Sequence, residues 1–302
     1  MLSFDDRAGL IWLDGALVPW AEARLHVLTH ALHMGGAVFE GMRAYDGRIF
    51  LGEAHLERLA QSAEWVGYGL PRAKLELTKA VEAVLWANAL HDAYVRPVAW
   101  RGSESASVAA RGASVHIAIA AWDWPTPAAL GRSHAGIRLQ LATWRRPRPD
   151  TAPTASKCSG LYMIGTLARH AALDAGFDDA LMLDAHDHVA ETTSTNVVLV
   201  KGETLISPVA DCFLDGITER HVFALASRRG LAVEERRVRL EDLRRADEVF
   251  VAGTSVEIQP VVELMEGERR SRWPVGPITR ALIADFQASV RERRAVGARA
   301  LV

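Results

Sequence analysis

The chain has 302 residues, of which 49% are hydrophobic and 24% are charged, and its formal net charge is -2 at pH 7. Such a chain can bury a substantial core, and its charge excludes the overall positive field typical of proteins that bind nucleic acid or anionic membranes. The acidic start and the absence of any uncharged apolar run of about 18 residues exclude a secretory signal and a membrane span, so we expect a cytoplasmic protein.

The N-terminal part of the chain predicts a mixture of strands and helices. Two Asp-Gly pairs, at 14–15 and 46–47, each stand between short apolar runs, a pattern that predicts β-hairpins. The segment 53–66 carries Leu56 and Leu59 at helical spacing and predicts an amphipathic helix. The predicted strands are 10–13, 16–18, 42–45, 48–51, 94–100 and 115–121, and the second predicted helix is 75–87.

A change of composition separates this part from the rest. The segment from Trp124 to Gly131 contains two prolines and a glycine and has neither helical nor strand periodicity. We therefore expect a small N-terminal α+β domain over residues 1–122, an interdomain linker over 123–136 and a larger C-terminal domain over 137–302.

The C-terminal part again mixes strands and helices. Because they do not follow a strict β-α-β rhythm, the fold class is predicted as α+β. Gly176 and Gly230 stand where glycines that end helices belong. Strands are predicted over 137–143, 179–184, 197–201 and 248–252, and helices over 161–175 and 219–229.

Lys157, one of four lysines in the chain, is the candidate amine nucleophile. It lies among small residues just before a predicted helix, where the helix dipole and partial burial favour the neutral amine that forms a Schiff base. Taken alone, its local sequence is more typical of a solvated loop lysine. Cys158 and Cys212 are expected to be free thiols, and Cys158 to be a small buried residue beside the lysine.

Glu191 is the candidate partner of a cofactor ring nitrogen. A carboxylate beside a pyridine nitrogen keeps that nitrogen protonated, and the protonated ring is the electron sink that stabilises a substrate carbanion. Taken alone, Glu191 with its neighbouring threonines is also typical of an exposed residue on a solvated strand.

Three segments carry groups that bind phosphate. Gly216-Ile217-Thr218 opens a predicted helix and Gly253-Thr254-Ser255 follows a predicted strand, so both offer backbone N–H groups and hydroxyls. Arg58, on the predicted helix 53–66, could add charge-assisted hydrogen bonds. The alternative is that Thr218 caps its helix, Gly253 turns the chain and Arg58 lies on the surface.

Arg43 and Arg96 lie in or beside apolar strands, where a guanidinium can bind a carboxylate through two hydrogen bonds. The alternative is that both face solvent. His26, His30 and His33 have no carboxylate that would complete a zinc site, so no metal is expected.

Seven segments, in this order, resemble the branched-chain aminotransferase family, within the fold type IV pyridoxal 5'-phosphate (PLP) enzymes. They are residues 30–45, 55–59, 94–97, 153–162, 191–196, 216–218 and 246–254. The resemblance spans roughly residues 10–290 and implies a two-domain fold, with a smaller N-terminal α/β domain and a larger C-terminal pseudo-barrel domain.

The resemblance implies a role for each matching residue. Lys157 would carry the cofactor as an internal aldimine and move the proton between substrate Cα and cofactor C4′, with Glu191 at the ring nitrogen and Tyr162 at the phenolic oxygen. The implied cofactor-binding residues are Arg58, Lys157, Tyr162, Glu191, Ile217, Thr218, Thr254 and Ser255. The implied substrate-binding residues are Phe39, Arg43, Tyr94, Arg96, Trp124, Thr254 and Ser255.

The implied reaction is a ping-pong transfer of the amino group of leucine, isoleucine or valine to 2-oxoglutarate, by a homodimer or higher homo-oligomer whose site forms across the dimer interface. Met34 stands where many relatives have tyrosine, and residues 192–195 replace a run that usually carries glycines. These departures leave open a D-amino-acid or (R)-amine transaminase, or an aminodeoxychorismate lyase, with the same cofactor. A further alternative is a non-catalytic oligomeric protein that retains the fold.

Overall fold

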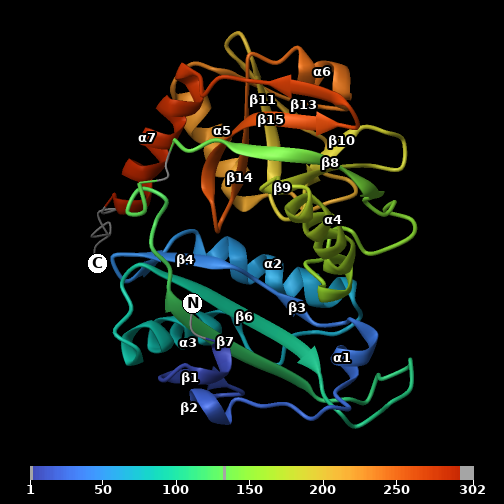
Figure 1. Ribbon diagram of the computed structural model, residues 1–302. Helices are drawn as coiled ribbons and strands as arrows, with labels where there is room; N and C mark the ends of the chain where they lie inside the picture. Colours follow the sequence, from blue (N-terminus) through green and yellow to red (C-terminus); the bar gives the residue numbers. More distant parts are fainter. Residues whose placement is uncertain (1–2, 132–133, 293–302) are drawn as a thin grey trace, which may run out of the picture.

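The computed structural model describes residues 3–131 and 134–292. One sheet with its helices forms the N-terminal part, and a second, larger sheet with its helices forms the C-terminal part, with α2 lying where the two parts meet (Figure 1). Within the described residues no helix is both long and apolar enough to cross a membrane.

The N-terminal sheet has seven strands in the order β2-β1-β7-β6-β4-β5, with β3 also paired to β6. Its strands are β1 (Leu10–Leu13), β2 (Ala16–Pro19), β3 (Val38–Phe39), β4 (Met42–Tyr45), β5 (Arg48–Ile49), β6 (Ala93–Arg101) and β7 (Val115–Asp123). Its helices are α1 (His30–Met34), α2 (Gly52–Trp65) and α3 (Lys74–Ala87), with 3-10 turns η1 (Phe4–Asp6) and η2 (Trp20–Glu22).

Apolar side chains on helical spacing bury α2 and α3 against this sheet. Leu56 and Leu59 of α2 and Val84 of α3 share one buried cluster with Ile117 and Ile119 of β7. The helices predicted at 53–66 and 75–87 are therefore confirmed, each beginning one residue earlier.

Both predicted hairpins are confirmed. Leu13 pairs with Ala16 across one turn, and Tyr45 pairs with Arg48 across the other. Asp14 and Asp46 adopt φ of 50° and 51°, the left-handed conformation that the tight turns of hairpins require and that aspartate tolerates.

The C-terminal sheet closes on itself. Its strands are β8 (Ile137–Arg145), β9 (Asp179–Leu183), β10 (Val189–Thr192), β11 (Asn196–Lys201), β12 (Thr204–Pro208), β13 (Ala232–Arg236), β14 (Glu248–Gly253), β15 (Glu257–Glu266) and β16 (Arg269–Arg272). Because β10 pairs with both β9 and β11, the strands β10-β9-β8-β15-β14-β11 form a closed six-stranded barrel. The predicted α+β fold with a C-terminal pseudo-barrel is thus confirmed.

Strands of the barrel are buried on both faces. Val197 and Leu199 of β11 point into the cluster inside the barrel, whereas Val198 and Val200 pack on an outer cluster with helices. This explains why β11 and β14 read as continuous apolar runs rather than as alternating ones. The C-terminal helices are α4 (Met163–Asp174), α5 (Ile217–Arg228), α6 (Leu240–Arg244) and α7 (Pro277–Arg291), with the 3-10 turn η3 (Ser159–Tyr162).

Two predicted elements differ from the structure. The helix predicted over 161–175 begins with η3, and α4 proper starts at Met163. Hydrogen bonds from Ser159 N to Ala37 O (2.8 Å) and from Gly160 N to Gly35 O (2.9 Å) tie this entry to the N-terminal part. The strand predicted over 48–51 ends at Ile49, because the chain turns there into α2.

Several elements have no counterpart in the sequence prediction: α1, α6, α7, β3, β10, β12, β13, β15 and β16. The predicted domain boundaries stay predictions; β7 ends at Asp123 and β8 begins at Ile137. Residues 132–133 of the predicted linker, and residues 1–2 and 293–302 of the two predicted domains, lie outside the described residues.

Candidate active site

Lys157 lies in the loop that joins β8 to η3, and its backbone is fixed by the N-terminal part. Lys157 N donates to Ser62 Oγ (3.0 Å), and Phe39 N donates to Lys157 O (3.2 Å). The side chain is half-buried, and its Nζ lies 2.8 Å from the hydroxyl of Tyr162 at the end of η3. Nζ also lies 5.3 Å from the centre of the Phe39 ring. The amine is therefore held at a defined position and is not a solvated loop group.

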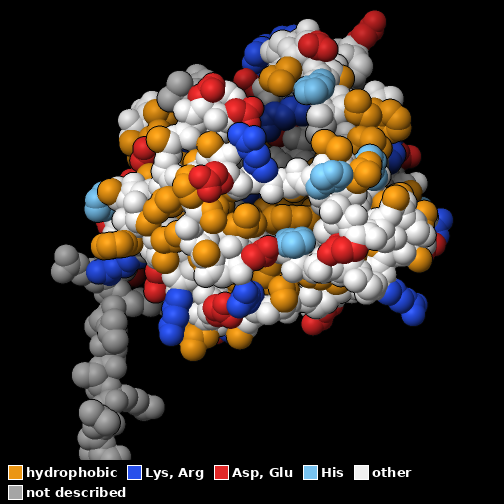
Figure 2. All heavy atoms as spheres, turned by 90° about the horizontal axis from the view of Figure 1, so that it is seen from below, with side chains coloured by type: hydrophobic (Ala, Val, Ile, Leu, Met, Phe, Trp, Pro, Cys, Tyr) orange, Lys and Arg blue, Asp and Glu red, His pale blue; other side chains and the backbone are white. Residues whose placement is uncertain are grey.

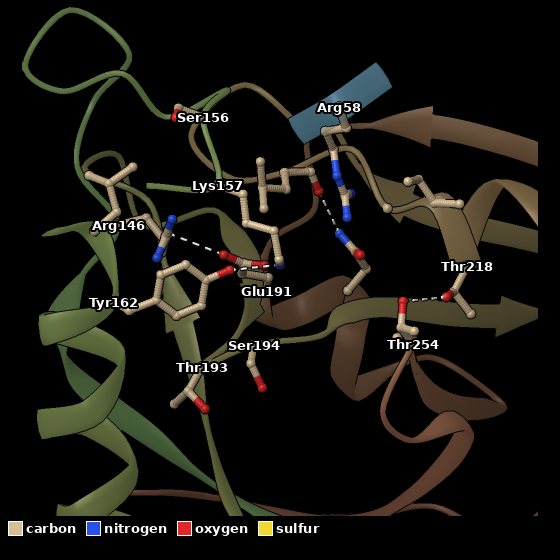
Figure 3. A pocket seen from close by; sticks show the side chains of 16 residues that line it. Arg58, Arg146, Ser156, Lys157, Tyr162, Glu191, Thr193, Ser194, Thr218 and Thr254 are labelled. Carbon is tan, nitrogen blue, oxygen red and sulfur yellow. Dashed lines mark hydrogen bonds and ion pairs between the residues drawn. The ribbon is translucent and has the colours of Figure 1, made fainter. Parts of the chain in front are cut away.

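Glu191 lies on β10 and is buried, so an exposed position on a solvated strand is wrong for this residue. Its Oε1 lies 3.3 Å from Arg146 Nε. Burial raises the pKa of the Glu191 carboxyl to about 7, although the charges of Arg146 and Lys157 act in the opposite direction. Figure 3 shows Arg146, Glu191, Tyr162 and Lys157 at the same end of one pocket.

The other end of this pocket offers groups that bind an anion. Thr218, at the start of α5, and Thr254, directly after β14, bring their hydroxyl oxygens within 3.5 Å of each other (Figure 3). Arg58 reaches from α2 to donate its Nη1 to Asp215 O at 3.3 Å. Together with Ile217 at the N-terminus of the twelve-residue α5, these groups form a site suited to a phosphate.

One predicted cofactor residue lies apart. Ser255 is not among the residues that line this pocket, and its carbonyl instead accepts a hydrogen bond from Trp124 Nε1 (3.3 Å). The turn that contains Ser255 therefore offers the pocket the side chain of Thr254.

The predicted substrate-binding residues form a second group beside Lys157. Arg96 lies with its guanidinium carbon 4.7 Å from the Phe39 ring centre and donates Nη2 to Tyr94 OH (3.2 Å). The rings of Tyr94 and Trp124 are 5.6 Å apart, and Trp124 O accepts from Arg43 Nη2 (3.2 Å). These aromatic rings and arginines form a continuous wall that begins at the lysine.

Arg43 is only 1% exposed, so a solvent-facing position is wrong for it. Its Nη2 lies 3.7 Å from Glu257 Oε1, and Glu257 also accepts from Tyr45 OH (3.0 Å). Among the described residues, Arg43 Nε, Arg43 Nη1 and Arg96 Nε are buried nitrogens with no hydrogen-bond partner. Buried donors without partners are costly, and a bound carboxylate could satisfy those that face it.

Three residues of the site were missed at the level of sequence: Arg146, Glu40 and Glu257. Arg146 is one of three arginines at 145, 146 and 148, and nothing in the sequence distinguishes it from the other two. Glu257 follows the predicted phosphate turn, with an unusual φ of 61° that only the structure reveals. Glu40 stands in the segment 30–45, but burial alone identifies its importance.

The set of groups fits PLP in type and in order. An amine suited to an aldehyde lies in the middle of the pocket, a buried carboxyl lies where a ring nitrogen would be, and a cluster of donors for an anion lies at the far end. This pairing of the groups with the parts of the cofactor places the phosphate beside both Arg58 and the helix N-terminus, where anions are favoured.

Comparison with known proteins assigns the family. The pattern of the class IV amino-transferases matches residues 37–264. The branched-chain-amino-acid aminotransferase of Pseudomonas aeruginosa is 36% identical to this chain, over 93% of the chain and 92% of the relative. The crystal structure of the Escherichia coli branched-chain amino acid aminotransferase superposes with a TM-score of 0.89 at 32% identity, covering 96% of this chain and 98% of that one.

A third relative, the branched-chain amino acid aminotransferase of T.th., was solved with N-(5'-phosphopyridoxyl)-L-glutamate. It superposes with a TM-score of 0.88 at 34% identity, covering 96% of each chain. These matches span nearly the whole chain and both of its parts. The chain therefore belongs to the branched-chain aminotransferase family, within the class IV amino-transferases.

Proposed function

We propose that the protein is a PLP-dependent aminotransferase that moves the amino group of branched-chain L-amino acids to 2-oxoglutarate by a ping-pong mechanism. The observation that carries this proposal is the contact of 2.8 Å between Lys157 Nζ and Tyr162 OH, in a pocket with a buried carboxyl at one end and an anion site at the other. PLP supplies an aldehyde that takes up the amino group and a ring that accepts the electrons of the substrate carbanion.

The residues of the chain then have defined tasks. Arg58, Thr218 and the N–H groups at the start of α5 hold the phosphate, with the Thr254 hydroxyl beside them. Glu191 holds a proton on the ring nitrogen. Lys157 Nζ takes the proton from the substrate Cα and returns it on the other side of the transfer, while Tyr162 keeps the amine in place.

The wall beside Lys157 fits a substrate that is apolar on one side and acidic on the other. Phe39, Tyr94 and Trp124 offer apolar surface to a branched side chain, and Arg96 can bind the second carboxylate of 2-oxoglutarate. The relative solved with the phosphopyridoxyl adduct binds L-glutamate in that form, which supports an L-configured donor and favours this specificity over the D-amino-acid and (R)-amine alternatives.

The test is to reduce the purified protein with borohydride and to map the modified peptide. We expect a yellow protein whose cofactor becomes fixed to Lys157, and a Lys157→Ala variant in which no lysine is labelled. A colourless protein, or a label elsewhere, would reject PLP chemistry at Lys157 and would favour the non-catalytic alternative.

The specificity is tested by single turnovers with L-leucine, D-alanine and an (R)-arylamine, followed as loss of the visible absorption of the bound cofactor. Loss with L-leucine alone supports the proposal. If only the D or (R) donor reacts, the protein has the same cofactor and a different substrate.

A homodimer is the second part of the proposal. Leu25, Leu28 and Leu32 are each more than half exposed; Leu25 and Leu32 line an apolar groove that also includes Gly35 and Gly160, next to the lysine loop. Figure 2 shows hydrophobic side chains gathered on the side of the N-terminal sheet. Exposed apolar surface of this kind marks protein interfaces, and a second copy seated here would lie close to the active site. The cytoplasmic location stays a prediction.

A further inference from the structure

A carboxylate that the proposed mechanism does not use lies directly behind the phosphate end of the pocket. Glu40 stands between β3 and β4, and its side chain is 0% exposed. Its backbone N–H donates to Pro97 O (2.9 Å), which fixes the residue to β6. A wholly buried carboxylate is rare unless charged or hydrogen-bonded partners offset the cost of removing it from water.

Two residues one turn apart on α2 supply those partners. Arg58 donates Nε to Glu40 Oε1 (2.6 Å) and Nη2 to Glu40 Oε2 (3.0 Å), and His55 Nδ1 lies 2.7 Å from the same Oε2. Because a carboxylate can only accept, Nδ1 carries the proton. Burial alone would raise the pKa of Glu40, but the charge and hydrogen bonds of Arg58 and the hydrogen bond of His55 outweigh it and hold this pKa far below its ordinary range.

This pairing decides which way the Arg58 guanidinium points. Glu40 occupies the edge formed by Nε and Nη2, so the guanidinium cannot rotate about its long side chain without breaking two charge-assisted hydrogen bonds. The remaining nitrogen, Nη1, is directed at Asp215 O, one residue before Gly216 and the start of α5. Arginine side chains lose much rotamer freedom on binding, so an arginine that is already held costs less to use.

We infer that Glu40 is a positioning residue, which fixes the Arg58 guanidinium toward the phosphate before the cofactor arrives. The inference rests on the proposed function, since it needs Arg58 to bind the phosphate. A second effect opposes it: the negative charge of Glu40 weakens the attraction between Arg58 and a phosphate. The two effects predict opposite results when the charge is removed, so experiment can decide between them.

The experiment compares PLP with pyridoxal, which has the same aldehyde and ring but no phosphate. Cofactor-free wild type, Glu40→Gln and Arg58→Met are titrated with each compound, and binding is followed by visible absorption. If positioning dominates, Glu40→Gln weakens PLP binding at least about tenfold, the loss of roughly one charge-assisted hydrogen bond. Pyridoxal binding should change less than about twofold, because its affinity does not depend on Arg58.

Glu248→Gln is the matched control. Glu248 is also a buried carboxyl, but it accepts from Ile278 N and Thr279 N at the start of α7 and does not line the pocket. Its loss should lower stability without changing the ratio of PLP to pyridoxal affinity. The double variant of Glu40→Gln with Arg58→Met should bind PLP no more weakly than Arg58→Met alone, because Glu40 acts through Arg58.

Three results would overturn the inference: equal weakening of PLP and pyridoxal, which indicates a structural role; unchanged PLP affinity; or tighter PLP binding, which shows that the charge effect dominates. If Arg58→Met keeps the wild-type preference for PLP, the assignment of the phosphate to Arg58 fails as well. Should Glu40→Gln not fold, Arg58→Lys asks the same question, since lysine keeps the charge but cannot form the paired hydrogen bonds. Lysine should then lose PLP affinity at least about tenfold, and wild-type affinity would count against positioning.

Discussion

Replacing Glu191 with glutamine should make the cofactor-free protein more stable at alkaline pH while it impairs the enzyme. Glu191 is buried, and burial raises its pKa from an ordinary value of 4.5 to about 7. Such a group favours folding while it is protonated, and it opposes folding once it must be ionised in a site away from water. Glutamine has a similar shape, keeps an oxygen for Arg146 and never ionises.

The magnitude follows from the two pKa values. Between pH 5 and pH 8 the unfolded chain has already lost the proton that the folded protein still holds, so the free energy of unfolding falls as pH rises. With one pKa unit equivalent to about 1.4 kcal/mol, the wild type loses about 2.5 kcal/mol over this interval through Glu191. The variant does not lose this contribution. The buried Glu219, whose pKa burial raises to about 8, titrates in both proteins and cancels in the difference.

The measurement is urea unfolding of wild type and Glu191→Gln, both without cofactor, at pH 5 and pH 8. We expect the difference in unfolding free energy to move in favour of the variant by about 2.5 kcal/mol between the two pH values. With PLP bound, the variant should lose at least about tenfold in kcat, because glutamine cannot hold the ring nitrogen protonated. A pH-independent difference in stability would refute the reasoning from burial, and unchanged kcat would refute the pairing with the ring nitrogen.

Three other substitutions test the neighbouring groups. Tyr162→Phe removes the hydroxyl 2.8 Å from Lys157 Nζ and should lower kcat at least about tenfold, with a stability change under about 1 kcal/mol in thermal unfolding; equal losses in both would indicate a structural tyrosine. Arg96→Met should raise KM for 2-oxoglutarate at least about tenfold and leave KM for L-leucine within a factor of about three, and a parallel rise in both would assign Arg96 another role. Glu257→Gln leaves the buried charge of Arg43 without its ion-pair partner and should cost about 2–4 kcal/mol in urea unfolding; a loss below about 0.5 kcal/mol would show that the pair contributes little.

Local patterns in the sequence were sufficient for the elements that depend on neighbouring residues. Asp-Gly turns between apolar runs specify hairpins, because the turn conformation is a property of those two residues. Apolar spacing specifies α2 and α3, because one face of each helix is buried. β15 and β10 escaped prediction because long-range pairing defines them: β15 pairs with β8, which lies far away in the chain, and β10 carries threonines and Glu191 rather than an apolar run.

The site divides in the same way. Lys157, Glu191, Thr218 and Thr254 lie in motifs whose order along the chain resembles a family, so the chemistry and the family followed from the sequence. Burial and direction did not: an exposed glutamate and a solvated lysine were as compatible with the local sequence as the positions that the structure shows.

The sequence by itself determined the types of reactive group, their order and hence the family, because these are properties of covalent structure. Only the tertiary structure decided which of the three arginines at 145, 146 and 148 meets Glu191, since burial of Arg146 and exposure of its two neighbours depend on where β8 ends. It likewise decided that Glu40 faces Arg58, because α2 and β3 meet only in the folded chain and a buried carboxylate is stable only where a matching donor has been placed beside it.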